Sequence, residues 1–116
     1  MTIYALSSGA GISGVAVIRV SGPETKKIIE KITIGPFPKA REATLKKINK
    51  INTTELIDEG ILLWFPAPQS YTGEDMAEFH VHGSIAVINA IQASISKIEN
   101  CRLAEPGEFT KIAFQN

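Results

Sequence analysis

GVAVIRV, residues Gly14–Val20, is a nearly continuous apolar run rich in valine and isoleucine. Such a run is typical of a central β-strand that is covered on both faces. A single charge, Arg19, interrupts it, and a lone guanidinium among apolar residues needs an anionic partner or a cleft. The run therefore predicts the middle of a sheet and marks Arg19 as a candidate functional residue.

Strand-like segments flank this run on both sides. Four more strands are expected, at Ile3–Leu6, Arg41–Lys50, Leu56–Phe65 and Met76–His82. The polar Arg41–Lys50 segment has the character of an edge strand, because its lysines discourage further pairing.

Two helices and a shorter third one are expected between and after these strands. Ser21 can cap the first, with Glu24 closing a capping box, and that helix is expected to end near Ile32. Ser84 can cap the second, which carries an apolar stripe suited to core packing, with a subunit interface as the alternative. The stripe consists of Ile88, Ile91, Ile95 and Ile98. A short helical pattern runs through Phe114.

Together these segments predict an α+β (mixed α/β) fold, with a mixed sheet of about five strands packed with two to three helices. Residues 1–116 are expected to form a single domain, since 116 residues suffice for one hydrophobic core. Twelve basic and twelve acidic residues balance, so no global field draws the chain toward nucleic acid. The one cysteine, Cys101, and the lack of an apolar run of about 20 residues favour a cytoplasmic protein without a membrane span.

Gly9–Gly14 (GAGISG) matches the dinucleotide-binding pattern G-x-G-x-x-G letter for letter. That pattern needs a helix directly after the glycines, whereas here a β-branched strand follows. We therefore reject a dinucleotide site. The glycine loop, including Gly11 and Gly14, can still bring its backbone close to a ligand or a partner subunit.

The segment Phe65–Gly83 concentrates polar chemistry beside an apolar strand, with Tyr71, Thr72 and Glu74 in its turn. Farther along the segment three side chains alternate and share one strand face, namely Glu78, His80 and His82. They could form a metal set, but positions i, i+2 and i+4 on a strand span roughly 13 Å. We favour a polar binding face. Arg19 either pairs with a carboxylate of this segment (Glu74, Asp75 or Glu78) or awaits an anionic or polar ligand.

Three groups of residues resemble, in the same order, the signatures of the tRNA-modification GTPase family MnmE, also called TrmE. They are GVAVIRVSG at Gly14–Gly22 with the glycines before it, WFPAP-x-SYTGED with E-x-H-x-HG at Trp64–Gly83, and RLA-x-PGEFTK at Arg102–Lys111. The resemblance covers essentially the whole chain.

The resemblance implies a domain similar to the tetrahydrofolate-binding domains of one-carbon enzymes. It implies binding of 5-formyl- or 5,10-methylene-tetrahydrofolate, with Arg19 and Glu78 at positions that the family uses to hold the folate. Tyr71 offers a face for stacking, and Gly11, Gly14, Thr72, Glu74 and His82 are possible supporting residues.

The resemblance also implies a homodimer formed through this domain. The full-length family protein works on wobble uridine of tRNA with MnmG (GidA), a partner that uses FAD and NADH. No G-x-x-x-x-G-K-[ST] loop occurs in the chain, so GTP, Mg²⁺ and K⁺ are expected only on domains outside it. The chain is expected to be an N-terminal piece that is not catalytic alone. Two alternatives remain open: a purely structural dimerisation module, and a metal-dependent hydrolase using Glu78, His80 and His82.

Overall fold

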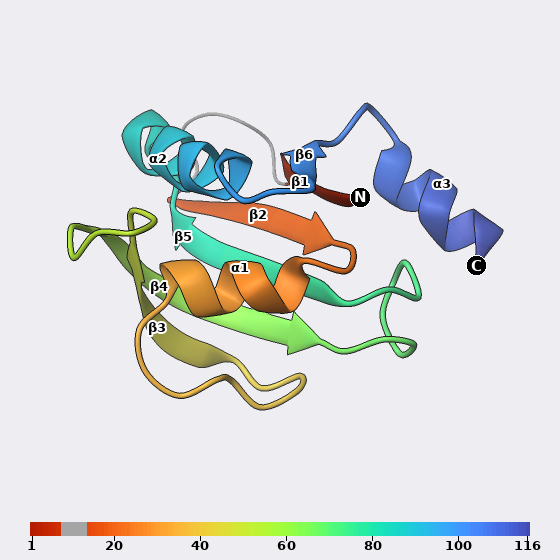
Figure 1. The fold of residues 1–116 in the computed structure, drawn as a ribbon, viewed down its shortest axis with the longest axis horizontal. Coiled ribbons are helices and arrows are strands. Elements are labelled where there is room, and N and C mark those ends of the chain that lie inside the picture. The colour runs from red at the N-terminus through yellow and green to blue at the C-terminus, as the bar shows by residue number, and fades with distance from the viewer. Residues whose placement is uncertain (8–13) are drawn as a thin grey trace.

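The computed structural model describes residues 1–7 and 14–116 and contains a six-stranded sheet in the order β3-β4-β5-β2-β1-β6 (Figure 1). The strands are β1 (Thr2–Leu6), β2 (Val15–Ser21), β3 (Thr44–Asn49), β4 (Leu56–Phe65), β5 (Met76–His82) and β6 (Cys101–Leu103). Adjacent strands are antiparallel except β1 and β6, which are parallel. The expected mixed sheet is confirmed. It has one strand more than expected, because the three-residue β6 was not recognised in the sequence.

Two of the three helices in the described part of the chain cover one face of this sheet. The helices are α1 (Thr25–Ile32), α2 (Ile85–Ser96) and α3 (Glu108–Gln115). In Figure 1 α1 and α2 lie across the front of the sheet, while α3 lies beside it, past β6. Apolar side chains of α1, α2 and the strands form one core beneath the two helices. The helix count confirms the α+β expectation.

Alternation along the strands decides which side chains enter this core. Ile18 on β2 and Phe79 on β5 are register partners and are both 0% exposed beneath the helices. Their neighbours Arg19 and Glu78 project from the other face. The expectation that β2 is covered on both faces is wrong for Val15, which is 53% exposed on that second face.

The second helix follows its sequence signals and the first does not. Ser84 caps α2, and its hydroxyl accepts the N–H of Val87. All four isoleucines of the predicted stripe are buried, with Ile98 just past the end of α2, so the core-packing interpretation is confirmed. The predicted capping box at Ser21 and Glu24 is wrong. Ser21 is the last residue of β2, and the N-cap of α1 is Glu24, which makes no side-chain cap hydrogen bond.

The polar segment Arg41–Lys50 was predicted to form an edge strand, and β3, which lies within it, is at one edge of the sheet. One of its lysines is not a free surface charge, because Lys46 is only 6% exposed and its ammonium donates to the carbonyls of Ile34 and Pro36. Among residues 1–7 and 14–116, no helix combines the length and apolar character needed to span a bilayer.

Candidate ligand-binding site

Arg19 and Glu78 meet on the sheet face that α1 and α2 leave uncovered. They are direct register partners in the antiparallel pairing of β2 with β5. The Arg19 Nε and Nη2 atoms donate to Glu78 Oε2 at 3.3 and 3.1 Å. The side chains are 31% and 19% exposed, so the ion pair is partly shielded from water yet reachable. Of the three carboxylates considered as partners of Arg19, the structure selects Glu78.

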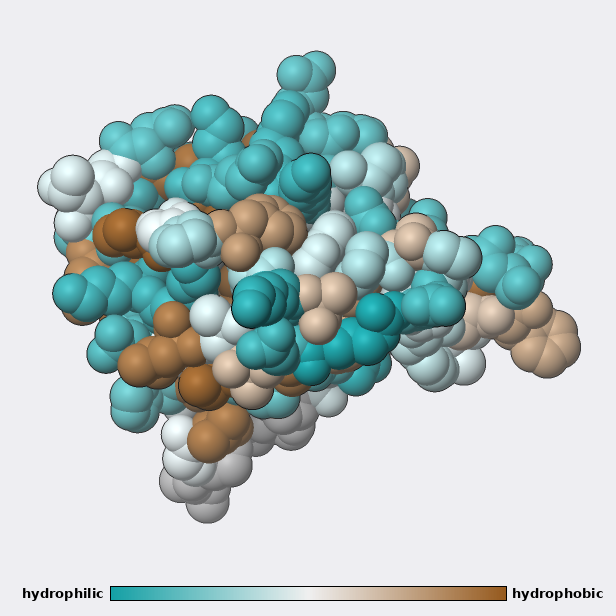
Figure 2. Space-filling model, turned by 90° about the horizontal axis from the view of Figure 1, so that it is seen from below, coloured by the Kyte–Doolittle hydropathy of each residue, from teal (hydrophilic) through white to brown (hydrophobic). Residues whose placement is uncertain are grey.

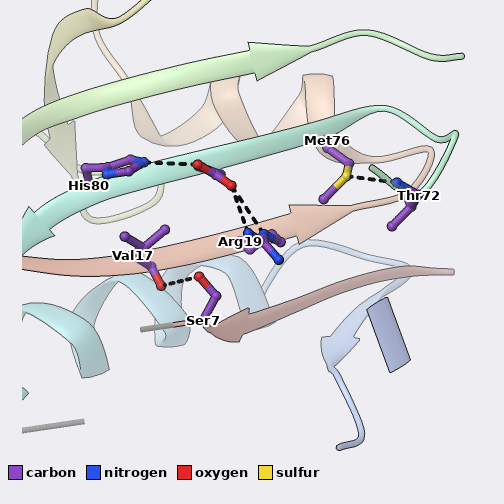
Figure 3. A network of polar contacts seen from close by, with 7 residues as sticks. Ser7, Val17, Arg19, Thr72, Met76 and His80 are labelled. Carbon is purple, nitrogen blue, oxygen red and sulfur yellow. Dashed lines mark hydrogen bonds and ion pairs between the residues drawn. The ribbon is translucent and has the colours of Figure 1, made fainter. Parts of the chain in front are cut away.

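His80 approaches the same carboxylate from another side. Its Nε2 lies 3.1 Å from Glu78 Oε1, the oxygen that Arg19 does not use. Figure 3 shows Arg19 and His80 on either side of the carboxylate between them. The sequence indicated that Glu78 and His80 share a face, but it did not single out His80 as a partner of Glu78.

Two aromatic rings complete the cluster at its Arg19 end. The guanidinium carbon of Arg19 lies 5.8 Å from the ring centroid of Tyr71 and 6.0 Å from that of Phe109. Both distances are within the range of cation–π attraction. Tyr71 is 56% exposed, so part of its ring is free for another contact. Phe109 was missed as a site residue. The only sequence signal was its place in the third family-like segment, which does not reveal contact with Arg19.

Helix α3 is tied to this end of the site by side-chain hydrogen bonds. The Tyr71 hydroxyl donates to Thr110 Oγ1 at 3.2 Å. The Asn116 amide donates to the carbonyl of Thr72 at 2.6 Å. These contacts join α3 to the turn before β5, and they bring Phe109 to Arg19.

Thr72 and Glu74, two of the predicted supporting residues, act on the turn itself. Ser21 Oγ lies 2.7 Å from Thr72 Oγ1 and donates to Glu74 Oε1 at 2.9 Å. Thr72 is 0% exposed, so it supports the turn from within. The turn thereby holds Tyr71 at the edge of the site.

His82, at the far end of β5, is committed to a different carboxylate. Asp58 accepts the backbone N–H of His82 at 2.9 Å and lies 2.9 Å from its Nδ1. Burial raises the pKa of the Asp58 carboxyl. Hydrogen bonds from the His82 backbone and ring and from the Glu59 backbone together lower this pKa by more than burial raises it, so it lies below its ordinary value. The His82 ring is therefore engaged by Asp58.

The metal alternative required Glu78, His80 and His82 to converge on one ion. Glu78 and His80 are in contact, whereas His82 is held by Asp58. Within the described residues, no group of three or more His, Cys, Asp or Glu side chains is placed to hold a metal ion.

The remaining predicted residues are the loop glycines. Gly11 lies outside the described residues. Gly14 directly precedes β2, and its carbonyl accepts the N–H of Gly83 at 3.3 Å. A shallow hollow of about 240 Å³ lies beside it on the uncovered face. Its lining includes Val15, Ile61 and His80, so the hollow extends the site along the sheet.

Comparison with known proteins assigns the chain to a family. The family described as "GTP-binding protein TrmE N-terminus" matches residues 2–116. A "tRNA modification GTPase MnmE" of Pelagibacter ubique (strain HTCC1062) is 72% identical over 100% of this chain and 26% of its own length. A protein of the same name from Rhodopseudomonas palustris (strain BisB18) is 50% identical over 99% of this chain and 25% of its own.

A mitochondrial relative from Danio rerio, "5-taurinomethyluridine-[tRNA] synthase subunit GTPB3", is 49% identical over 97% of this chain and 22% of its own length. The chain thus spans about a quarter of the length of these relatives. It belongs to the TrmE N-terminal domain family and corresponds to the N-terminal region of the tRNA-modification GTPases MnmE.

Proposed function

We propose that this chain binds a reduced folate, 5-formyl- or 5,10-methylene-tetrahydrofolate, on the uncovered face of its sheet. The observation that supports the proposal most directly is the meeting of Arg19, Glu78 and Tyr71 in one cluster. These three residues come from β2, β5 and the turn before β5. Only the folded sheet brings them together.

The chemistry of the cluster suits a folate. The pterin ring carries an N–H and an amino group side by side, and a carboxylate such as Glu78 can accept both. An ionised carboxylate has about four acceptor positions, so Glu78 keeps acceptor capacity beyond its contacts with Arg19 and His80. The exposed Tyr71 ring offers a stacking face, and Arg19 suits a carbonyl or carboxylate of the ligand.

The proposed role for the bound folate is to hold a one-carbon unit for modification of wobble uridine in tRNA. Two of the relatives named above are called tRNA modification GTPases. GTP binding, with Mg²⁺ and K⁺, would belong to segments outside this chain. The FAD- and NADH-using partner MnmG and the tRNA would meet the full-length protein.

We further propose that the chain forms a homodimer through the uncovered sheet face. Val15 and Leu45 are 53% and 61% exposed there, and Ile61 lies between them in the hollow of about 240 Å³. Figure 2, which looks at the molecule from below the view of Figure 1, shows apolar side chains gathered toward the lower left of the molecule. Exposed apolar side chains around a shallow hollow are typical of a protein–protein contact.

Calorimetric titration of the chain with 5-formyl-tetrahydrofolate, with light scattering on the same samples, tests both parts. Saturable binding near one ligand per chain, by a dimer, is the expected result. A folded dimer without folate binding would contradict the folate proposal and support a purely structural dimerisation module. The observation that favours this alternative is the ion pair between Arg19 and Glu78, in which each charge already has a partner without a ligand. A folded monomer would contradict the dimer.

A further inference from the structure

We propose that His80 is a positioning residue that fixes the carboxylate plane of Glu78 for the ligand. The inference rests on the proposed folate site and adds to it a residue, a tautomer and a ligand chemistry. His80 is not needed to hold the fold's core, since its side chain is 31% exposed.

The two oxygens of Glu78 are divided between two donors. Arg19 donates twice to Oε2, at 3.3 and 3.1 Å, and His80 Nε2 lies 3.1 Å from Oε1. The terminal torsion of a glutamate is broad, so a carboxylate held at one oxygen alone can turn about that torsion. Donors on both oxygens stop this rotation. His80 therefore supplies the second of two fixed points.

This arrangement dictates the tautomer of His80. An ionised carboxylate only accepts hydrogen bonds, so the proton of a neutral His80 ring must be on Nε2. Nδ1 is then left as an acceptor.

The surroundings of His80 keep the ring aimed at Glu78. On either side its register partners are apolar, Val17 on β2 and Ile61 on β4. Among the described residues that line the hollow beside His80, the other charged or titratable groups are Glu59 and His82. His82 is held by Asp58. The contact with Glu78 is thus the polar contact that the structure gives the His80 ring.

A carboxylate fixed at both oxygens recognises a particular ligand edge. Each oxygen has about two acceptor positions. Arg19 occupies both positions of Oε2 and His80 occupies one of Oε1, so one position of Oε1 stays open. An open acceptor of fixed direction matches a ring edge that presents an N–H or amino donor, such as a 2-amino-4-oxopyrimidine edge. A ring with an acceptor at that place would leave this position without a donor, which is unfavourable. His80 thereby contributes to selecting a donor edge.

The test compares His80→Gln with His80→Leu in calorimetric titrations with 5-formyl-tetrahydrofolate. Gln places an amide N–H donor near the Nε2 position, whereas Leu removes the donor at similar size. We expect His80→Gln to bind within about threefold of the wild type, and His80→Leu to bind about tenfold more weakly, as for loss of a hydrogen bond to a charged group. Equal loss in both variants, or none in His80→Leu, would overturn the inference.

A second readout is independent of the ligand. Nitrogen-15 NMR of the histidine rings should show His80 as the Nε2–H tautomer, and Glu78→Gln should shift that signal; the Nδ1–H tautomer would overturn the inference. The outcomes separate the two proposals. Failure of the wild type to bind overturns both the folate site and the role of His80. If the wild type binds, Glu78→Gln weakens the binding and His80→Leu does not, the role of His80 alone is overturned.

Discussion

Arg19 and Glu78 lie opposite each other in the register of β2 and β5, with Nη2 and Oε2 3.1 Å apart. Because side chains alternate between faces, a slip of one residue in this pairing would send Arg19 into the apolar layer under α1 and α2. The buried partners Ile18 and Phe79 prevent that slip. The register that builds the core therefore also builds the candidate site.

Replacing Glu78 by Gln should weaken the binding of 5-formyl-tetrahydrofolate by about tenfold or more, because a neutral amide accepts fewer of the pterin donors. The fold should persist, since Glu78 is outside the core. Calorimetry gives the affinity and thermal unfolding reports on the fold. Glu30→Gln, a change of the same chemistry at an exposed position of α1, is the matched control. Unchanged affinity in Glu78→Gln would remove this residue from the site.

Replacing Phe79 by Ala should lower the free energy of unfolding by about 3–5 kcal/mol, because the ring is 0% exposed and its loss leaves a cavity. Denaturant titration measures the difference. Phe114→Ala makes the same change at a position that is 93% exposed and should have a small effect. Similar losses in the two variants would contradict the assignment of Phe79 to the core.

Replacing Gly60 by Ala should be strongly destabilising. A Cβ at Gly60 would lie 2.3 Å from the carbonyl oxygen of His80, which is backbone of the neighbouring strand β5. The clash would push β4 from β5, at a cost of about 2–3 kcal/mol. Gly14→Ala is the comparison, since a Cβ there would meet nothing within 4 Å. Chemical denaturation of both variants checks the difference, and a neutral Gly60→Ala would show that β4 passes β5 at a greater distance.

The Asp58–His82 contact should appear in the acid stability of the protein. Hydrogen bonds lower the pKa of Asp58 in the folded chain, so the contact stabilises the fold above the ordinary pKa of an aspartate. This contribution is lost as the pH falls through the lowered pKa. Denaturant midpoints at about pH 6, 4 and 3 should therefore fall less steeply in Asp58→Asn than in the wild type. The exposed carboxylate of Glu42 provides the control, as Glu42→Gln. Parallel pH profiles in wild type and Asp58→Asn would refute the role of this contact.

The proposed dimer face can be tested by adding a charge to it. Leu45→Glu places a carboxylate on the exposed apolar part of the uncovered face and should shift the chain toward a monomer, because burying a charge in an interface is costly. Sedimentation velocity over a range of concentrations measures the shift. Ile85→Glu changes an apolar residue on the helical side that is also well exposed, at 74%, and should leave the dimer intact. A dimer that survives Leu45→Glu would place the contact elsewhere.

Local patterns predicted those parts of the fold that depend on neighbours in sequence. The strands Leu56–Phe65 and Met76–His82 have the predicted bounds. The Ser84 cap is a local signal too, because the serine hydroxyl accepts the N–H of Val87, only three residues later in the chain. Strand β6 was missed because it has three residues and exists through its parallel pairing with β1. No local pattern encodes such a partner.

The failed cap at Ser21 has the same origin. Its hydroxyl is engaged by Thr72 and Glu74, about fifty positions later in the chain, and its backbone continues β2. Long-range contacts also explain the site. The shared face of Glu78 and His80 follows from strand alternation, whereas the approach of Phe109 to Arg19 depends on how α3 folds back, which the sequence does not indicate.

The parallel pairing of β6 with β1 has a consequence for the order of events on the ribosome. Strand β1, which is synthesised before the other strands of this sheet, lies between β2 and β6, and hydrogen bonds from Thr2 to Asn100 and from Ala104 to Tyr4 close its outer side. Until residues 100–104 leave the exit tunnel, the backbone groups of that outer side have no strand to pair with. A nascent or truncated chain that ends before Cys101 therefore carries an open β-edge, which is the kind of surface that recruits chaperones or pairs with other unfinished chains.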